Sequence, residues 1–133
     1  MEKHEFATFD LPRARDLYIE AARGGHAGAQ LRLGEAYEKG ELGQEIDLEV
    51  ARTWYQNAAE GGDEDTQYRL GGAYEEGELG LVTDEEEALK WYKMAADVGY
   101  SLAQWPLGDA CEFGDLGLKI DLQLALMWYL KAV

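Results

Sequence analysis

Residues 29–65 read AQLRLGEAYEKGELGQEIDLEVARTWYQNAAEGGDED, and residues 66–102 read TQYRLGGAYEEGELGLVTDEEEALKWYKMAADVGYSL. Aligned without an insertion, the two segments share 19 identical residues in 37. A third segment, residues 103–133, keeps the Leu-Gly and Trp-Tyr pairs at the same spacing, as Leu107-Gly108 and Trp128-Tyr129. Self-similarity at such a period indicates a repeat architecture, in which each unit buries its apolar face only against its neighbours.

The period also extends backwards from the first complete repeat. Five residues of its second half recur 37 places earlier, as Asp10, Ala14, Tyr18, Ala21 and Ala22. We therefore predict an N-terminal half repeat over residues 1–28 (the second helix of a preceding unit), repeats over 29–65 and 66–102, and a third repeat over 103–133. Truncation of a longer array at the C-terminus is left open as an alternative.

Within each unit, apolar residues recur at helical spacing and predict two helices. The first helix is predicted to end at Gly40, because glycine tolerates the left-handed conformation that ends a helix. Asp47 is placed to cap the second, since its carboxylate can accept from unpaired backbone N–H groups. Alanine and glycine let helix axes approach closely, and tryptophan and tyrosine fill the space between units. The predicted fold is an all-α, right-handed α-solenoid of stacked antiparallel helix pairs with a 37-residue repeat.

The repeated residues carry a family resemblance. The pattern Ala-x-x-x-Leu-Gly-x-x-Tyr-x-x-Gly, then Asp, then Ala-x-x-Trp-Tyr-x-x-Ala-Ala, resembles the Sel-1-like repeat, a relative of the tetratricopeptide repeat. Residues 103–133 depart from it at Cys111, where the other repeats have tyrosine, and at Pro106, early in the first helix. The resemblance implies an adaptor or scaffold in protein complexes, and it supplies no shared active site.

The net charge of the chain limits the classes of partner that it is expected to bind. With 12 Lys and Arg against 27 Asp and Glu, the net charge is −15, which repels nucleic-acid phosphates and attracts basic segments. We predict a protein or peptide partner, favour a basic one and expect no nucleic acid; acidity that only keeps the chain soluble is the alternative. The apolar run Leu124–Leu130 is too short to cross a bilayer, so we expect no membrane insertion.

Few residues are suited to chemistry. Cys111, the single cysteine, excludes an internal disulfide, fits a reducing compartment and stands at a core position, where a thiol is inert. The histidines, His4 and His26, complete no nucleophile–base pair, and no acidic run has calcium-ligand spacing. We therefore expect no catalytic residues, no metal site and no cofactor.

The first residues of the chain bear on its cellular compartment. Residues 1–10, MEKHEFATFD, lack the apolar core of a secretory signal. Together with the cysteine content, this predicts a cytoplasmic protein, with a leader removed from the chain as the alternative.

The residues opposite the core face of the first helices are the candidate binding surface. In solenoids of the family that the chain resembles, first helices line the concave surface, so these positions would face a ligand. They vary between units while the core does not, as expected if each unit contacts a different part of one partner; a merely solvated face is the alternative. The predicted partner-binding groove consists of Arg32, Glu35, Lys39, Arg69, Glu75, Glu76, Asp109, Glu112 and Phe113.

Equivalent carboxylates form two further rows when the units are stacked. One row contains Glu38, Glu75 and Glu112, and the other contains Glu41, Glu78 and Asp115. Such rows predict a track for a Lys- or Arg-rich peptide whose binding weakens as salt rises.

The last helix is apolar where a terminal unit should be polar. Met127 and Leu130 stand where the preceding repeat has Lys90 and Lys93. We predict that the chain forms a homo-oligomer through this helix, or else that a longer array was truncated there. The predicted self-association surface consists of Leu122, Leu126, Met127, Leu130 and Val133.

From these features we predict a non-catalytic protein–protein interaction scaffold or adaptor that holds a partner segment in its concave groove. A structural or self-association module that acts through the apolar C-terminal helix is the alternative. An enzyme is a third class, because some cysteine-rich relatives in the resembled family have been linked to β-lactam binding, but their disulfide pairs are absent here.

Overall fold

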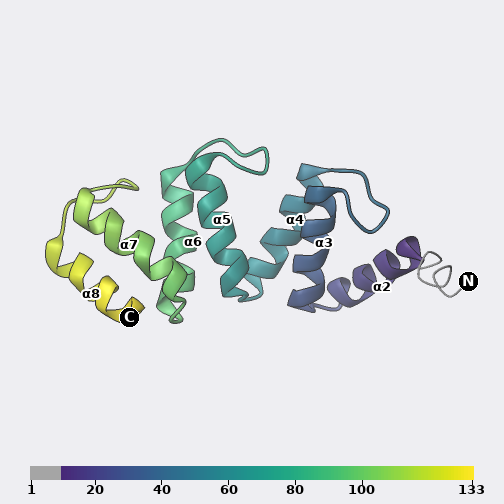
Figure 1. Cartoon of the computed structure of the whole chain (residues 1–133), viewed down its shortest axis with the longest axis horizontal. Helices are drawn as coiled ribbons and strands as arrows, with labels where there is room; N and C mark the ends of the chain where they lie inside the picture. Colours follow the sequence, from purple (N-terminus) through teal and green to yellow (C-terminus); the bar gives the residue numbers. More distant parts are fainter. Residues whose placement is uncertain (1–9) are drawn as a thin grey trace, which may run out of the picture.

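The computed structural model describes residues 10–133, which form seven α-helices and contain no strand. The helices are stacked along the long axis of the molecule, with α2 at one end and α8 at the other (Figure 1). None of them is long and apolar enough to cross a membrane. His4 and the stretch used to predict the absence of a secretory signal, apart from Asp10, lie outside the described residues. The helices are α2 (Leu11–Arg23), α3 (Ala27–Lys39), α4 (Leu48–Glu60), α5 (Glu64–Glu76), α6 (Glu85–Asp97), α7 (Ser101–Phe113) and α8 (Leu122–Ala132).

The first helices stop, and the second helices start, at the residues predicted to cap them. The carboxylates of Asp47, Asp84 and Asp121 accept backbone N–H groups three residues further on, at 3.2, 3.1 and 3.0 Å. Gly40 follows α3 in the left-handed conformation, with φ of 73°, and the equivalent glycines after α5 and α7 have φ of 73° and 75°. The predicted N-caps and glycine stops are therefore confirmed.

Within each hairpin, a glycine lets the two helices cross closely. A methyl group placed on Gly34 would lie 2.7 Å from the ring of Tyr55, which is nearer than packed carbon atoms approach. The equivalent distances are 2.6 Å for Gly71 on Tyr92 and 2.5 Å for Gly108 on Tyr129. The recurrence of Leu-Gly and Trp-Tyr in the sequence is thus the recurrence of one helix crossing.

A buried glutamine joins each hairpin to the one before it. The side-chain Nε2 of Gln67, on α5, donates to the carbonyl of Ala59, on α4, at 3.0 Å. The same bond recurs from Gln30 to Ala22 at 3.0 Å and from Gln104 to Ala96 at 3.1 Å. Because a buried amide that lacks a partner is costly, this bond fixes how one hairpin leads into the next.

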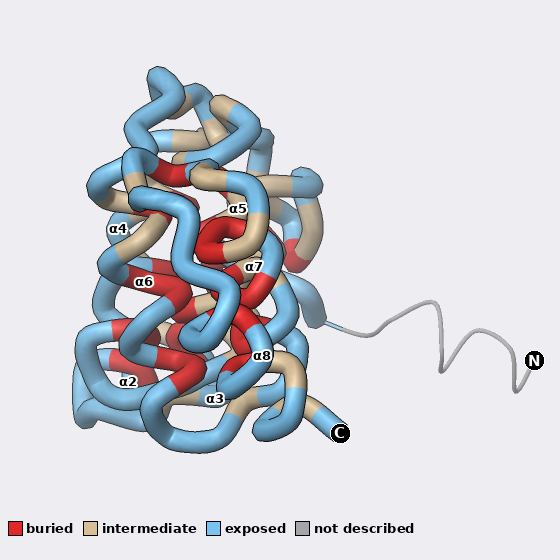
Figure 2. Tube along the Cα trace, turned by 90° about the vertical axis from the view of Figure 1, so that its left-hand side faces the viewer, coloured by how far each residue is buried: buried red, intermediate tan, exposed pale blue. Residues whose placement is uncertain are grey.

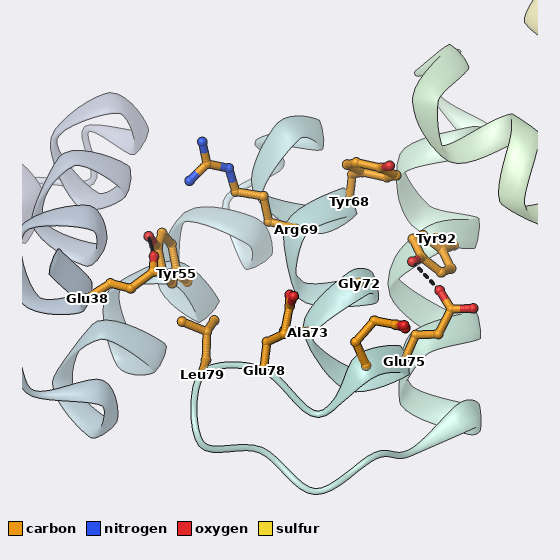
Figure 3. Close-up of a pocket in the computed structure, with 11 residues that line it drawn as sticks. Glu38, Tyr55, Tyr68, Arg69, Gly72, Ala73, Glu75, Glu78, Leu79 and Tyr92 are labelled. Atoms are coloured by element: carbon orange, nitrogen blue, oxygen red, sulfur yellow. Dashed lines mark hydrogen bonds between the residues drawn. The ribbon is translucent and has the colours of Figure 1, made fainter.

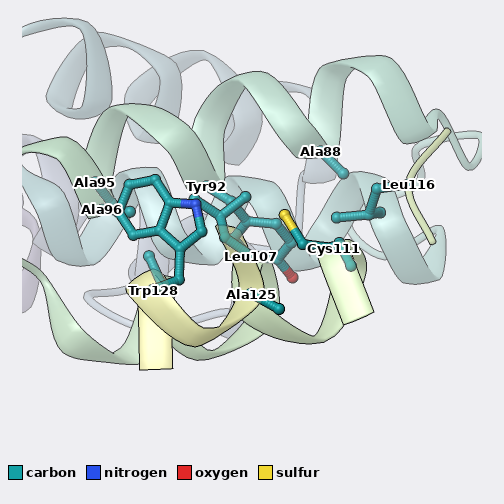
Figure 4. Packing of buried hydrophobic residues seen from close by; sticks show 11 residues of the cluster. Ala88, Tyr92, Ala95, Ala96, Leu107, Cys111, Leu116, Ala125 and Trp128 are labelled. Atoms are coloured by element: carbon teal, nitrogen blue, oxygen red, sulfur yellow. The ribbon is translucent and has the colours of Figure 1, made fainter. Parts of the chain in front are cut away.

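The core combines small residues with a few large ones, and it runs along the inside of the stack (Figure 2). In the last two hairpins, Trp128 and Tyr92 pack among alanines and Leu107 (Figure 4). Cys111 is buried in the same cluster, and this burial raises the pKa of its thiol. The α-solenoid of stacked antiparallel helix pairs is therefore confirmed, and its core is divided into clusters shared between neighbouring units.

Candidate functional site

Three pockets open between successive hairpins at equivalent positions of the repeat. They lie between α2 and α3, between α4 and α5, and between α6 and α7, with volumes of about 720, 410 and 490 Å³. We call them the α2–α3, α4–α5 and α6–α7 pockets; Figure 3 shows the α4–α5 pocket. Each is lined by a tyrosine of the preceding helix and a leucine of the following loop: Tyr18 and Leu42, Tyr55 and Leu79, and Tyr92 and Leu116.

The three loop leucines adopt a backbone conformation that leucine disfavours. Leu42, Leu79 and Leu116 have φ of 57°, 56° and 55°. Holding a side chain in this left-handed region costs of order 1–3 kcal/mol, and it persists only where the surroundings enforce it. At Leu79, the guanidinium of Arg52 donates to the backbone carbonyl at 2.7 Å. The fold thus places a leucine in each pocket at the expense of local backbone strain.

The predicted row of glutamates is not a free row of charges. The hydroxyl of Tyr55 donates to Oε1 of Glu38 at 2.5 Å, and that of Tyr92 donates to Oε1 of Glu75 at 2.7 Å. Figure 3 shows both bonds beside the α4–α5 pocket. In the last hairpin, the single hydroxyl proton of Tyr129 is shared between two acceptors, Glu112 at 2.8 Å and Asp109 at 2.5 Å. Each carboxylate is therefore oriented by a tyrosine, which occupies one of its two oxygens.

The tyrosines that orient these carboxylates stay protonated well beyond their usual range. Burial raises the pKa of Tyr55 and Tyr92, and the hydrogen bonds to Glu38 and Glu75 raise it further. The hydrogen bond to Asp109 is the main cause of the raised pKa of Tyr129. The hydroxyls consequently remain donors through the neutral range, and the carboxylates keep their orientation.

The structure brings five of the nine predicted groove residues to these pockets. Arg32 lines the α2–α3 pocket; Arg69 and Glu76 line the α4–α5 pocket; Asp109 lines the α6–α7 pocket; and Glu75 lines the last two. Glu35 lies beside them, with a carboxylate oxygen 3.2 Å from Nη1 of Arg69. The other three are at the C-terminal ends of first helices and line none of the three pockets: Lys39, Glu112 and Phe113.

Sequence reasoning missed two aromatic residues on the pocket walls. Tyr68 lines both the α4–α5 and α6–α7 pockets, and Trp105 lines the second. The ring of Tyr68 lies 5.8 Å from that of Tyr92, and the ring of Trp105 lies 4.8 Å from that of Tyr129. A signal was present, because the equivalent position changes from Leu31 to tyrosine to tryptophan along the array.

Charge changes along the row of pockets. Of the described residues that line the α2–α3 pocket, Arg32 is a cation and none is a carboxylate. The α4–α5 pocket contains Arg69 and four glutamates, Glu38, Glu75, Glu76 and Glu78. In the α6–α7 pocket, the described lining residues include Glu75, Asp109 and Asp115 and no lysine or arginine. The pockets share one frame but offer different electrostatic surroundings.

The apolar side chains of the last helix are exposed, apart from those in its core face. On α8, Leu122, Leu126 and Leu130 are 65%, 58% and 64% exposed, while Trp128 is buried. The remaining members of the predicted self-association surface, Met127 and Val133, are exposed as well.

His26 and Cys111, the described residues best suited to chemistry, have structural roles in the fold. His26 caps α3: its Nδ1 accepts the N–H of Ala29 at 3.0 Å. The raised pKa of Cys111 disfavours the thiolate that a nucleophile requires. Within residues 10–133, no group of three His, Cys, Asp or Glu side chains is arranged to hold a metal ion.

Comparison with known proteins agrees with the repeat geometry. A family model described as Sel1 repeat matches residues 9–26, 27–63, 65–100 and 101–133. A crystal structure of a Sel1 repeat protein from Oxalobacter formigenes is similar, with a TM-score of 0.81 and 38% identity over 89% of this chain and 88% of that one. No match was found among curated proteins.

A second crystal structure is similar over only part of its length. It is that of c5321, a protective antigen present in uropathogenic Escherichia coli strains and displaying an SLR fold. The TM-score is 0.79 and the identity 38%, over 92% of this chain but 26% of c5321.

Proposed function

The chain belongs to the Sel1 repeat family, whose members generally mediate protein–protein interaction, and we propose that it is a non-catalytic scaffold or adaptor that binds an extended partner segment along its three pockets. Successive side chains of the segment would enter the α2–α3, α4–α5 and α6–α7 pockets. The constant tyrosine and leucine, which are largely buried, would form the floor of each pocket, and the variable residues would contact the segment and select its sequence.

The observation that carries the proposal is the recurrence of a strained pocket. The left-handed leucines recur in all three loops, and each lines a pocket. Backbone strain of this kind concentrates where a binding surface is built. The rings of Tyr68 and Trp105, which line the α6–α7 pocket, supply large and rigid contact area of the kind that dominates protein interfaces.

Charge favours a basic partner. The chain has a net charge of −15, and the α4–α5 and α6–α7 pockets are rich in carboxylates. A segment that contains lysine or arginine would be steered to these pockets, and its association rate would fall as salt screens the field.

Selection from a displayed library of random peptides tests the proposal without knowledge of the natural partner. We expect the chain to enrich basic peptides that contain aromatic or aliphatic residues. The selected peptide should bind the variant Glu76→Lys about tenfold more weakly than the unmodified chain, because Glu76 lines the α4–α5 pocket.

The matched control is Glu45→Lys, which makes the same charge change on an exposed loop residue that lines none of the pockets. Its affinity for the peptide should stay within about twofold of the unmodified chain, since a distant exposed charge is screened. Equal affinities for the unmodified chain and Glu76→Lys, with helicity unchanged by circular dichroism, would contradict binding along the pockets.

A second function is favoured by the exposed face of α8. Leu122, Leu126 and Leu130 stand where α6 has Glu85, Leu89 and Lys93, and all three are more than half exposed. Contiguous apolar surface of this kind is typical of an interaction site. Self-association through α8 would make the chain a structural module, either alone or together with partner binding.

Sedimentation velocity over a wide concentration range tests this second function. A dimer that dissociates on dilution is expected, and the double variant Leu126→Glu and Leu130→Glu should be monomeric because it places charge in the interface. A monomer at the highest concentration of the unmodified chain would rule out self-association through α8.

A further inference from the structure

Among the described residues, the lining of the α6–α7 pocket has no counterpart of the cation that its two equivalents contain. Arg32 and Arg69 occupy one position of the repeat, and Pro106 occupies it in the last repeat. Nη1 of Arg32 lies 2.7 Å from Oε1 of Glu41, and Arg69 lies 3.2 Å from Glu35. The α2–α3 and α4–α5 pockets are therefore supplied with a guanidinium by the chain itself.

The acid of the Arg32–Glu41 pair is retained where the cation is lost. Asp115 is the equivalent of Glu41, and it lines the α6–α7 pocket together with Pro106. Glu75 and Asp109 line the same pocket and add two further carboxylates. The last pocket consequently keeps the acidic half of a charge pair whose basic half is missing from the described residues around it.

Two of these carboxylates are held in place before any ligand arrives. Oε1 of Glu75 accepts from Tyr92 at 2.7 Å, and Oδ1 of Asp109 accepts from Tyr129 at 2.5 Å. A carboxylate has two oxygens, so each of these bonds leaves a second oxygen to accept from a cation. Fixed acceptors cost less ordering entropy on binding than mobile ones.

Aromatic faces complete the pocket. Tyr68 and Trp105 line it with accessible rings, and Trp105 is half exposed, with its ring packed 4.8 Å from that of Tyr129, whereas Tyr92 is buried and forms the floor. Aromatic rings attract cations over their faces, and the planar guanidinium stacks on them better than an ammonium group does. Among the described residues, the combination of two accessible rings, three carboxylates and no built-in cation is specific to this pocket among the three.

We propose that the α6–α7 pocket binds the guanidinium of an arginine side chain of the partner segment, which takes the place that Arg32 and Arg69 fill in the other repeats. This inference rests on the proposed function and names the residue type that the last pocket selects. Stacking on Trp105 and hydrogen bonds to Glu75 and Asp109 hold the cation.

Titration with a capped amino acid tests the pocket by itself. The probe is N-acetyl-arginine N-methylamide, and the readout is the chemical shift of the Trp105 indole N–H and of the α7 backbone amides. We expect saturable shifts at these groups. The citrulline analogue, which has the same shape and no charge, should bind at least about tenfold more weakly, and the lysine analogue should bind more weakly than arginine.

Two substitutions at one position provide the matched variants. Pro106→Arg restores the cation found in the other repeats and should lower the affinity for the arginine probe at least about tenfold. Pro106→Gln adds a polar side chain at the same position without charge and should lower the affinity less than Pro106→Arg does. Both remove a proline from inside α7, so neither is expected to unfold the chain.

Three results would overturn the inference. They are equal binding of the arginine and citrulline probes, an affinity for lysine equal to or above that for arginine, and an arginine affinity that Pro106→Arg leaves unchanged. The titration is independent of the peptide selection described above. A chain that binds selected peptides but not the arginine probe would retain the proposed function and lose this assignment of the α6–α7 pocket.

Discussion

The α2–α3 and α6–α7 pockets occupy equivalent places in the array, yet they offer opposite chemistry. Of the described residues, the first is lined by Arg32 and by no carboxylate, and the second by three carboxylates and by no lysine or arginine. Both are built on the same tyrosine, the same left-handed leucine and the same buried glutamine. The comparison separates a constant frame, which fixes where a pocket lies, from a variable lining, which fixes what it attracts.

The largest expected difference in stability between the constant frame and the variable lining concerns two tryptophans. Trp91 is 2% exposed and belongs to the core, whereas Trp105 is 50% exposed and belongs to the pocket lining. Trp91→Ala should lower the free energy of unfolding by about 3–5 kcal/mol, because it leaves a cavity. Trp105→Ala should cost less, because half of that side chain is already exposed and its loss leaves no closed cavity; the aromatic pair with Tyr129 contributes about 0.5–1.5 kcal/mol of the cost. Urea unfolding followed by circular dichroism measures both; similar losses would remove the distinction.

The next largest expected difference in stability is between alanine substitutions at two neighbouring glycines. A methyl group on Gly71 would lie 2.6 Å from the Tyr92 ring, whereas one on Gly72 would meet only the Tyr92 hydroxyl, at 3.6 Å. Gly71→Ala should therefore destabilise the chain by about 1–3 kcal/mol through overpacking. Gly72→Ala should stabilise it by up to about 1 kcal/mol through helix propensity. Thermal melting compares the two, and a Gly71→Ala variant as stable as Gly72→Ala would contradict the crossing geometry.

A smaller effect concerns Tyr100, which replaces the capping residues His26 and Asp63 of the other repeats. Its hydroxyl donates to Asp65 at 2.8 Å. Tyr100→Phe should cost about 0.5–1.5 kcal/mol at neutral pH. Burial, followed by that hydrogen bond, raises the pKa of Tyr100 to about 12. Because the tyrosines of the unfolded chain lose their protons near pH 10, stability should fall as the pH rises from about 10 to 12.

Urea midpoints measured across that pH range check the Tyr100 prediction. The unmodified chain should lose stability more steeply than Tyr100→Phe, which has no proton to lose at this position. Parallel curves for the two proteins would show that Tyr100 does not contribute to the alkaline instability.

The smallest effect on stability should come from Arg69→Gln. Arg69 is partly exposed, and its ion pairs with Glu35 and Asp65 are worth at most about 1 kcal/mol. The change nevertheless removes the cation from the α4–α5 pocket, which contains four glutamates. We expect a second site for the arginine probe, so that two pockets respond in the chemical-shift titration. Shifts confined to the α6–α7 pocket would show that removing the cation does not create a site.

The frame of the molecule was predictable because its causes are local or periodic. Asp47 caps a helix through a residue three places on, and Gly40 ends one through its own backbone. The stacked helix pairs followed from the constant 37-residue spacing of the Leu-Gly and Trp-Tyr pairs. Such features depend on few neighbours, so the sequence pattern is sufficient to place them.

The pockets were less predictable because their lining is assembled from different units. Leu79 is an unfavourable residue for a left-handed backbone, and the guanidinium of Arg52, from the preceding unit, donates to its carbonyl. The hydrogen bond of Tyr55 to Glu38 crosses a hairpin and changes an apparent row of free charges into oriented acceptors. Arg69 and Asp109, predicted from the exposed face of the first helices, line pockets, but that face gave no reason to include Trp105.

The most direct test of a constant frame with a variable lining uses the leucine methyl groups as reporters. Leu42, Leu79 and Leu116 each line one pocket, so their methyl resonances report on all three at once. On titration with a peptide selected by display, the account predicts that all three leucines shift together with the same dissociation constant. Shifts confined to α8, or to one pocket only, would contradict a partner segment bound along the row.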